Sequence, residues 1–191
     1  MRRVIVEQIP WAYACCDALI TAEDVASASR FQSASRRNEH LAWRRVVRRE
    51  LGRAISIDYN AVGAPVVSTP DTYISVSHGA GCVAVAISDS RVGIDIESTE
   101  RDFAYVKSRY MSPEEEQLSS DTNWPAMVWA AKEALYKLYG KRGIGLRDEL
   151  QIESYDANTQ QLKARVGGDK EALVDIELYD DTIVVATAYY N

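Results

Sequence analysis

The chain has few residues of the kinds that build zinc sites, disulfides and membrane spans. Its 191 residues include two histidines and three cysteines, and adjacent Cys15 and Cys16 lack the C-x-x-C spacing of a ligand pair. We interpret Cys15, Cys16 and Cys82 as small apolar side chains. No apolar run approaches the roughly 20 residues that cross a bilayer. Glu7 also interrupts the N-terminal segment before a signal-peptide core develops. We therefore expect a cytoplasmic protein without a membrane partner.

An excess of positive charge is also missing. The 22 lysines and arginines are outnumbered by 28 acidic residues, and the net charge of −6 argues against a nucleic-acid partner. Arginines nevertheless crowd one segment, at Arg36, Arg37, Arg44, Arg45, Arg48 and Arg49. This local reversal of sign indicates a small anionic ligand or a solvated helix face.

Strand and helix patterns alternate along the whole chain. Strands are predicted over residues 2–7, 73–77, 82–88 and 91–97, with a turn over 78–81. Helices are predicted over 35–52 and 126–139. Ser112 and Glu115 form a capping box that opens a further helix. The tail is predicted to form antiparallel strands over 150–154, 161–166, 171–178 and 182–190.

The two halves of the sequence repeat one order of elements. A strand ending in Glu7 or Glu97 precedes a helix that carries Trp43 or Trp129, and an apolar strand closes each half. The matching strand segments are Val4–Glu7 with Ile94–Glu97, and Val83–Ala86 with Val184–Thr187. A recurring order of this kind favours an internal duplication.

This repeat predicts the fold class and the domain organisation. We expect an α+β fold with a pseudo-twofold duplication of two similar subdomains, each a long helix packed on a small antiparallel sheet. Residues 1–90 form the N-terminal repeat and 91–191 the C-terminal repeat, packed as one unit because no Pro/Gly/Ser-rich linker separates them. Because an internal pseudo-dimer removes the usual need for a partner subunit, we expect a monomer.

Two acidic residues share a face of one predicted strand. In Gly93-Ile94-Asp95-Ile96-Glu97, alternation directs Asp95 and Glu97 to one side and the isoleucines to the core. Two carboxylates that close repel each other unless a cation or open water separates them. Oxygen ligands suit magnesium, manganese or calcium. Taken alone, the pattern also fits an ordinary half-exposed strand.

Two further signals are weak when taken singly. Glu133 and Lys137 are i, i+4 neighbours on the 126–139 helix, a spacing that many surface ion pairs share. His78 lies at a strand end beside Gly79, where its side chain or a backbone amide would meet a phosphate. A lone histidine is more often a turn or core residue.

Together, these motifs identify a family resemblance. They are Ser-x-Ser-His-Gly at 75–79, Ala-Val-Ala-Ile at 84–87, Gly-Ile-Asp-Ile-Glu at 93–97 and Trp-x-x-Lys-Glu-Ala-x-x-Lys at 129–137. In this order and spacing the chain resembles the 4′-phosphopantetheinyl transferases over roughly residues 30–190. The larger, double-repeat branch of that family is the closer match, in agreement with the duplication.

The resemblance implies a function. Coenzyme A would donate its 4′-phosphopantetheine arm to a serine of an apo acyl or peptidyl carrier protein, with Mg²⁺ as cofactor and adenosine 3′,5′-bisphosphate as the leaving product. Asp95, Glu97 and Glu133 correspond to the magnesium ligands of the family. Glu133 is also a candidate base for the serine proton, and Lys137 would neutralise charge on the breaking bond. The residues implied to bind coenzyme A are Ser77, His78, Lys132, Arg37 and Arg44.

The sequence departs from the family pattern in one loop. Family members often carry Gly-Lys-Pro where this chain has Gly63-Ala64-Pro65, so a cation expected near the coenzyme A phosphates is missing. Arg36, Arg37 and Arg44 are the candidates to replace it; otherwise a weaker grip on the 3′-phosphate is expected. On position alone, residues 103–128 and the loop at 141–142 are candidates for the surface that meets the carrier.

Two other functions remain open from the residues. A catalytically degenerate relative would bind coenzyme A or a carrier without transfer, and Ala64 is the best support for it. A metal-dependent nuclease also uses acidic groups with a lysine, but the usual E-x-K strand pattern is absent and the chain is acidic. Incubation with DNA and magnesium tests the nuclease alternative.

Overall fold

The computed structural model describes residues 1–10 and 17–191, so Cys15 and Cys16 lie outside the described residues. The helices are α1 (Ala22–Ala28), α2 (Ala34–Leu51), α3 (Lys107–Tyr110), α4 (Pro113–Glu116) and α5 (Trp124–Tyr139). The strands are β1 (Arg3–Gln8), β2 (Ile57–Tyr59), β3 (Pro65–Val67), β4 (Tyr73–Gly79), β5 (Cys82–Ser88), β6 (Val92–Ser98), β7 (Leu150–Asp156), β8 (Gln161–Val166), β9 (Lys170–Tyr179) and β10 (Ile183–Tyr190). The α+β class is confirmed.

The long elements agree with the sequence patterns, with small differences at their ends. The turn of the β4–β5 hairpin is shorter than predicted, because β4 runs through His78 and Gly79 and the chain reverses at Ala80 and Gly81, both at positive φ. His78 is therefore a strand residue. The capping box of Ser112 and Glu115 is present, but the helix that it opens ends within about one turn, at Glu116. Cys82 is buried, as an apolar side chain would be.

The two halves have the same strand connectivity. The first sheet has the order β1-β5-β4, and the second begins with the corresponding order β6-β10-β9 before adding β8 and β7. The registers also correspond, since Glu7 pairs with Val83 and Glu97 pairs with Val184. These are the segments that the sequence comparison matched. The two halves thus share a strand order, and the internal duplication stays a prediction.

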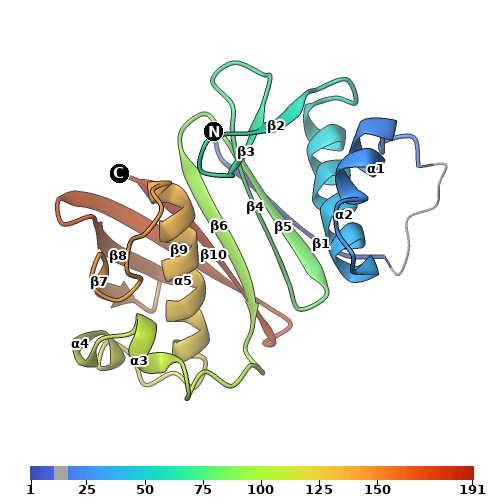
Figure 1. Ribbon diagram of the computed structural model, residues 1–191. Coiled ribbons are helices and arrows are strands. Elements are labelled where there is room, and N and C mark those ends of the chain that lie inside the picture. The colour runs from blue at the N-terminus through green and yellow to red at the C-terminus, as the bar shows by residue number, and fades with distance from the viewer. Residues whose placement is uncertain (11–16) are drawn as a thin grey trace.

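The halves meet along β4 and β6. Figure 1 shows β6 running between the two lobes, with α5 on the larger sheet and α1 and α2 on the outer side of the smaller one. The Ile94 amide donates to Ser75 Oγ at 3.0 Å across this seam. A Cβ on Gly79 would lie 2.7 Å from the Ile96 carbonyl oxygen, so glycine permits the close approach. Apolar residues of both halves, including Ala84, Ile94 and Val185, form a shared core there.

Gly93 brings α5 into direct contact with β6. A Cβ at this position would lie 2.0 Å from the Ala134 carbonyl oxygen and 2.7 Å from the Leu138 amide nitrogen. Only a residue without a side chain allows the helix backbone to cross the strand so closely. The residues that follow Gly93 on the strand therefore face those that flank Ala134 on the helix, which sets the geometry of the site.

Candidate functional site

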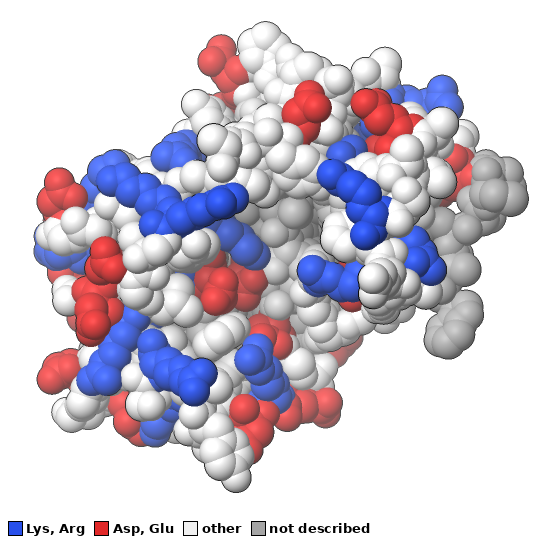
Figure 2. Space-filling view, in the orientation of Figure 1, with Lys and Arg blue, Asp and Glu red and all other residues white. Residues whose placement is uncertain are grey.

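A cleft of about 560 Å³ opens between the two halves. Its walls come from β4, the loop at 59–65, the start of α2, the end of α5 and the loop at 140–142. Four lysines and arginines line it, and no aspartate or glutamate does: Arg36, Lys137, Lys141 and Arg142. Figure 2 shows a hollow at the junction of the lobes with basic side chains on both sides. Such a lining favours an anionic ligand.

Asp95 joins three elements at one end of this cleft. Lys137 of α5 donates to Asp95 Oδ1 at 2.8 Å and also to the Ile94 carbonyl oxygen at 2.8 Å. Ser77 of β4 donates its hydroxyl to the same Oδ1 at 2.7 Å. Asp95 is largely buried, so these charge-assisted hydrogen bonds compensate for the lost hydration of its carboxylate.

Glu133 lies one helical turn before Lys137, in the same electrostatic environment as Asp95. Burial raises the pKa of its carboxyl group, and the negative charges of Asp95 and Glu97 act in the same direction. Lys137 and Arg101 oppose that rise in the pKa. The carboxylate of Glu133 makes no hydrogen bond or ion pair with any described residue. The charges of Asp95 and Glu97 on β6 therefore act on Glu133 of α5, as expected if the three predicted carboxylates lie near one another.

Glu97 is held by an arginine. Arg101 donates to the Glu97 carboxylate, and the Ser98 amide donates to it at 3.0 Å. The same guanidinium lies over the ring of Trp129, 4.7 Å from its centroid, and over Phe103 at 5.2 Å. Stacking of this kind holds a guanidinium in place.

The chemistry of this donor set fits a divalent cation that prefers oxygen, because all three groups are carboxylates. In their described positions the side chains do not form a metal site: within residues 1–10 and 17–191, no three histidines, cysteines or acids lie close enough to hold an ion. Asp95 is bound by Lys137 and Ser77, and Glu97 by Arg101. The assignment of these acids as magnesium ligands stays a prediction, and it requires that Arg101 release Glu97.

His78 lines the cleft beside Arg36. Arg36 Nη1 lies 3.0 Å from His78 Nε2, and Glu39 Oε2 lies 3.3 Å from His78 Nδ1. Burial lowers the pKa of the imidazole; Arg36 and Lys137 lower it further, against Glu39 and Asp95. Because an arginine can only donate, a neutral ring accepts at Nε2 and carries its proton on Nδ1. Arg36 therefore places a positive charge at the cleft beside a neutral His78.

Lys132 does not reach the cleft, although the resemblance implied a phosphate-binding role for it. Its side chain is fully buried in the second half, where Nζ lies 2.7 Å from the Glu115 carboxylate. Glu115 also accepts from the Ser112 amide and from the Ile152 amide, both at 2.8 Å. Lys132 is one residue, about 100° of helix rotation, away from Glu133, so the two point in different directions. The prediction for Lys132 is corrected to a structural ion pair.

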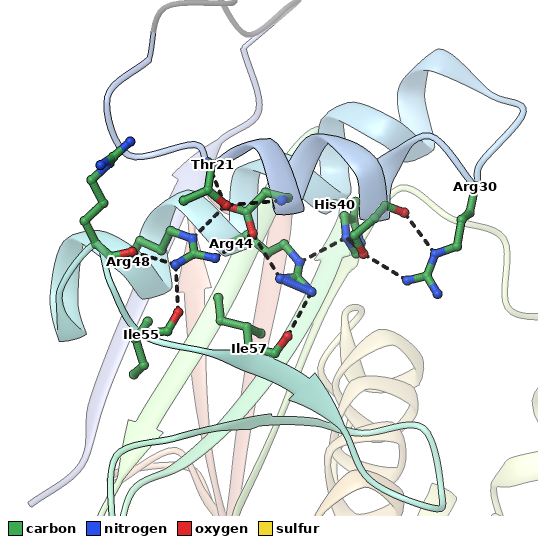
Figure 3. Close-up of polar contacts among 10 residues, drawn as sticks. Thr21, Arg30, His40, Arg44, Arg48, Ile55 and Ile57 are labelled. Atoms are coloured by element: carbon green, nitrogen blue, oxygen red, sulfur yellow. Dashed lines mark hydrogen bonds and ion pairs between the residues drawn. The ribbon is translucent and has the colours of Figure 1, made fainter.

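Arg44 is also a structural residue. It is buried, and its guanidinium donates to Asp24 Oδ1 at 3.0 Å, to His40 Nε2 at 3.1 Å and to the Ile57 carbonyl oxygen at 3.2 Å. Figure 3 shows how these contacts tie α1 and α2 to the segment that leads into β2. Arg48 completes the network by binding Asp24 through two nitrogens, at 2.6 and 2.9 Å. The network fixes the chain just before the cleft wall at 59–65.

Arg37 points away from the cleft as well. Its guanidinium donates to the carbonyl oxygens of Phe31 and Gln32, at 2.7 and 2.8 Å, and so closes the turn before α2. Of the three arginines considered as replacements for a lysine at Ala64, only Arg36 lines the cleft. Lys141 and Arg142, which were candidates for the carrier-binding surface on position alone, have side chains that line the cleft.

The sequence model of one family, described as the 4′-phosphopantetheinyl transferase superfamily, matches residues 91–188, just over half of the chain. The chain belongs to this superfamily. The matched segment contains Asp95, Glu97, Glu133 and Lys137, so the predicted metal ligands and the lysine bound to Asp95 belong to the shared part. Membership supports a transferase that moves a phosphopantetheine group. No curated protein matches the chain.

The superfamily assignment also bears on the alternatives left open by the sequence. It favours group transfer over the nuclease alternative. None of the helices within the described residues has the length and apolar character needed to span a membrane.

Proposed function

We propose that this protein transfers the 4′-phosphopantetheine arm of coenzyme A to a serine of an apo acyl or peptidyl carrier protein. The observation that carries the proposal is the convergence of Asp95, Lys137 and Ser77 at the floor of a basic cleft between the halves. Superfamily membership supplies the class of group transferred. The carrier and the nucleotide donor are inferred from this class and from the charge of the cleft.

The reaction is a single displacement at phosphorus. The serine hydroxyl oxygen of the carrier attacks the β-phosphorus of coenzyme A and forms a new P–O bond. The bond between that phosphorus and the bridging oxygen breaks, and adenosine 3′,5′-bisphosphate leaves with the electron pair. The serine proton passes to a base. Enzymes accelerate such displacements mainly by positioning the reactants and by neutralising developing charge.

Two residues of α5 have roles in this scheme. Glu133 has a pKa raised by burial and by its acidic neighbours, which makes its carboxylate a stronger base for the serine proton. Lys137 lies at the same end of the cleft and would neutralise charge on the bridging oxygen as the bond breaks. Ser77 and Asp95 position Lys137 and hold its ammonium toward the cleft floor.

The three acidic residues near Lys137 would also hold the cofactor. Asp95, Glu97 and Glu133 would bind Mg²⁺ through carboxylate oxygens, and a bound ion would neutralise pyrophosphate charge. The basic side chains that line the cleft, Arg36 among them, would balance the remaining negative charge of coenzyme A. Trp43 and Tyr59 add aromatic surface to the same cleft, which suits a nucleotide base.

A degenerate binder is the second candidate, and one observation favours it. Glu97, a proposed metal ligand, is already neutralised by Arg101, which is itself held by Trp129. If this arrangement persisted with coenzyme A bound, the protein would hold its ligand without transferring the arm. A transfer assay that also measures coenzyme A binding separates the two candidates.

The direct test is mass spectrometry of apo-carrier proteins after incubation with the protein, coenzyme A and magnesium. We expect a carrier to gain the mass of one phosphopantetheinyl group, and to gain none after its acceptor serine is replaced by alanine. Glu133→Gln should abolish the gain while coenzyme A binding survives. If carriers of fatty-acid, peptide and polyketide synthesis all remain unmodified while coenzyme A binds, the degenerate binder is the correct function.

A further inference from the structure

The cations of the cleft differ in whether they already have an acidic partner. Arg36 is paired with Glu39 at 3.3 Å and Lys137 with Asp95 at 2.8 Å. Lys141 and Arg142 make no ion pair with any part of the chain that the structure describes, and both are exposed to the cleft. Lys141 lies over the ring of Tyr139, 4.9 Å from its centroid. Arg142 is therefore a cation at the cleft with neither an acidic nor an aromatic partner among those residues.

Arg142 reaches across to the opposite wall of the cleft. Its Nε donates to the Val62 carbonyl oxygen at 3.3 Å, although the two residues are 80 positions apart. A Cβ on Gly63 would lie 3.4 Å from Arg142 Nη2, so the guanidinium rests on the glycine. One end of the guanidinium thus contacts the residues just before Ala64, where the family often has its lysine.

The loop that receives Arg142 is held by its own hydrogen bonds. Asn60 Oδ1 accepts from the amides of Val62 and Ala64, at 3.1 and 3.0 Å. Gly63 adopts φ +86°, a conformation that glycine reaches without strain. Because Gly63 has no side chain, the fixed loop leaves room there for the guanidinium of Arg142. Arg142 supplies to this wall the positive charge that Ala64 does not.

Lys137 is held at β6, whereas Arg142 rests on the loop of Val62, so the two cations are placed to meet different phosphates of coenzyme A. The reacting pyrophosphate must lie near Lys137 and the carboxylates of Asp95 and Glu133, because the displacement takes place there. Coenzyme A carries one more phosphate, on the 3′-oxygen of its ribose, and this group lies further from the reacting phosphorus. Arg142 makes one hydrogen bond to Val62 out of the five N–H donors that a guanidinium offers, and its planar fork fits two phosphate oxygens at once.

We infer that Arg142 binds the 3′-phosphate of coenzyme A and replaces, from the second half of the chain, the cation missing at Ala64 in the first half. This inference rests on the proposed function. It makes Arg142 a residue that determines specificity for coenzyme A over dephospho-coenzyme A.

The test is calorimetric titration of the full-length protein with coenzyme A and, separately, with dephospho-coenzyme A, at one fixed salt concentration. We expect the unmodified protein to prefer coenzyme A by about 10-fold or more, since hydrogen bonds between charged groups contribute about 1.5–3 kcal/mol. In Arg142→Ala that preference should fall to about 2-fold, with the affinity for dephospho-coenzyme A nearly unchanged. Arg142→Gln gives an independent variant of similar size, and circular dichroism checks that both are folded.

Two controls sharpen the comparison. Lys141→Ala removes the neighbouring positive charge and should retain the preference for coenzyme A. Adding Ala64→Lys to Arg142→Ala places a cation on the first-half loop and should restore much of the preference. The inference is overturned if Arg142→Ala weakens both ligands equally, if it changes neither, or if Lys141→Ala alone removes the preference. An unmodified protein that binds neither ligand would refute the proposed function itself.

Discussion

Lys137 Nζ donates a hydrogen bond to Asp95 Oδ1 at 2.8 Å and so joins α5 to β6 at the floor of the cleft. The two residues are 42 positions apart in the sequence, and the contact depends on the close crossing of helix and strand at Gly93. The ammonium group also bonds the Ile94 carbonyl oxygen, so its position is set from both sides. A cation held this firmly is organised before any ligand arrives, which is the arrangement that electrostatic catalysis requires.

Replacing Lys137 should therefore reduce the rate of transfer more than the affinity for coenzyme A. We expect Lys137→Met to lower kcat by about 100- to 1000-fold, the usual effect of removing one preorganised charge-stabilising group. Carrier modification followed by mass spectrometry measures the rate, and calorimetry measures the affinity. Lys163→Met, which removes an exposed lysine on β8, is the matched control and should leave both unchanged. Equal rates for the two variants would exclude Lys137 from the chemistry.

Replacing Lys132 should instead reduce the stability of the fold and leave coenzyme A binding unchanged. Replacing it by methionine leaves the Glu115 carboxylate buried with only backbone amides as partners. Removing one member of a buried ion pair typically costs about 3–5 kcal/mol. We expect Lys132→Met to lower the free energy of urea unfolding by that order, while the folded variant keeps its affinity for coenzyme A. A variant of normal stability with weakened coenzyme A binding would restore the role implied by the family resemblance.

The contrast between these two lysines shows what the sequence can predict. Alternation on a strand and i, i+4 spacing on a helix are local, and they placed Asp95 with Glu97 and Glu133 with Lys137. That the two pairs share one site was implied only by the family resemblance. The partner of Lys132 is a capping residue 17 positions away, and no local pattern connects the two. The motif placed Lys132 next to Glu133 in sequence, whereas helix geometry turns the two side chains to different faces.

The arginine-rich segment was harder to interpret for the same reason. Its six arginines were predicted to form an anion site or a solvated face, but Arg44 and Arg48 are buried against a single carboxylate, Asp24 of α1. The spacing of arginines along one helix does not show that a neighbouring helix carries the carboxylate that binds them. The strands matched between the halves occupy equivalent places in the two sheets, but no strand order was predicted from the sequence, because pairing between strands is not a local property.

Gly93 should be intolerant of any side chain. A Cβ there would meet backbone atoms of Ala134 and Leu138, which cannot move without displacing α5. We expect Gly93→Ala to destabilise the protein by about 3 kcal/mol or more, at the upper end of the overpacking range. Gly145→Ala is a suitable control, because its Cβ would meet only a carboxylate oxygen of Glu149 at an ordinary 3.7 Å. Thermal unfolding followed by circular dichroism measures both variants, and similar melting temperatures would contradict the close crossing of α5 and β6.

His40 should make stability depend on pH between about 4 and 6.5. Burial lowers the pKa of its imidazole to about 4, and the positive charges of Arg44 and Arg30 add to the effect against Asp24. The unfolded chain takes up a proton near pH 6.5, whereas the folded protein does so only near 4, so stability falls as the pH falls through this range. The loss attributable to His40 is on the order of 3 kcal/mol.

Urea unfolding at pH 4.5 and 7 tests this dependence. Other titrating groups also change stability over the same range, so the informative quantity is the difference between the original protein and His40→Gln. We expect His40→Gln to lose less stability than the original protein between the two pH values, because glutamine does not titrate. An identical loss in both proteins would show that His40 takes up its proton at the ordinary pKa.

Arg101 should compete with a divalent cation for Glu97. Its guanidinium bonds the carboxylate and is held over Trp129 and Phe103, so a metal ion that uses Glu97 must displace it. We expect Arg101→Ala to bind Mn²⁺, a spectroscopic probe for the magnesium site, several-fold more tightly than the unmodified protein. The physical reasons are the loss of a competing hydrogen bond and of a nearby positive charge.

Electron paramagnetic resonance of free Mn²⁺ measures this affinity without reference to transfer activity. The matched control is Arg165→Ala, because Arg165 also forms an ion pair at the surface, with Glu153, but lies on β8, which β10 and β9 separate from β6 in the sheet. It should leave Mn²⁺ binding unchanged, so an equal increase in both variants would indicate only a change in net charge. Unchanged or weaker binding in Arg101→Ala would mean that Glu97 is free to bind the ion without displacing the arginine, or is not one of its ligands.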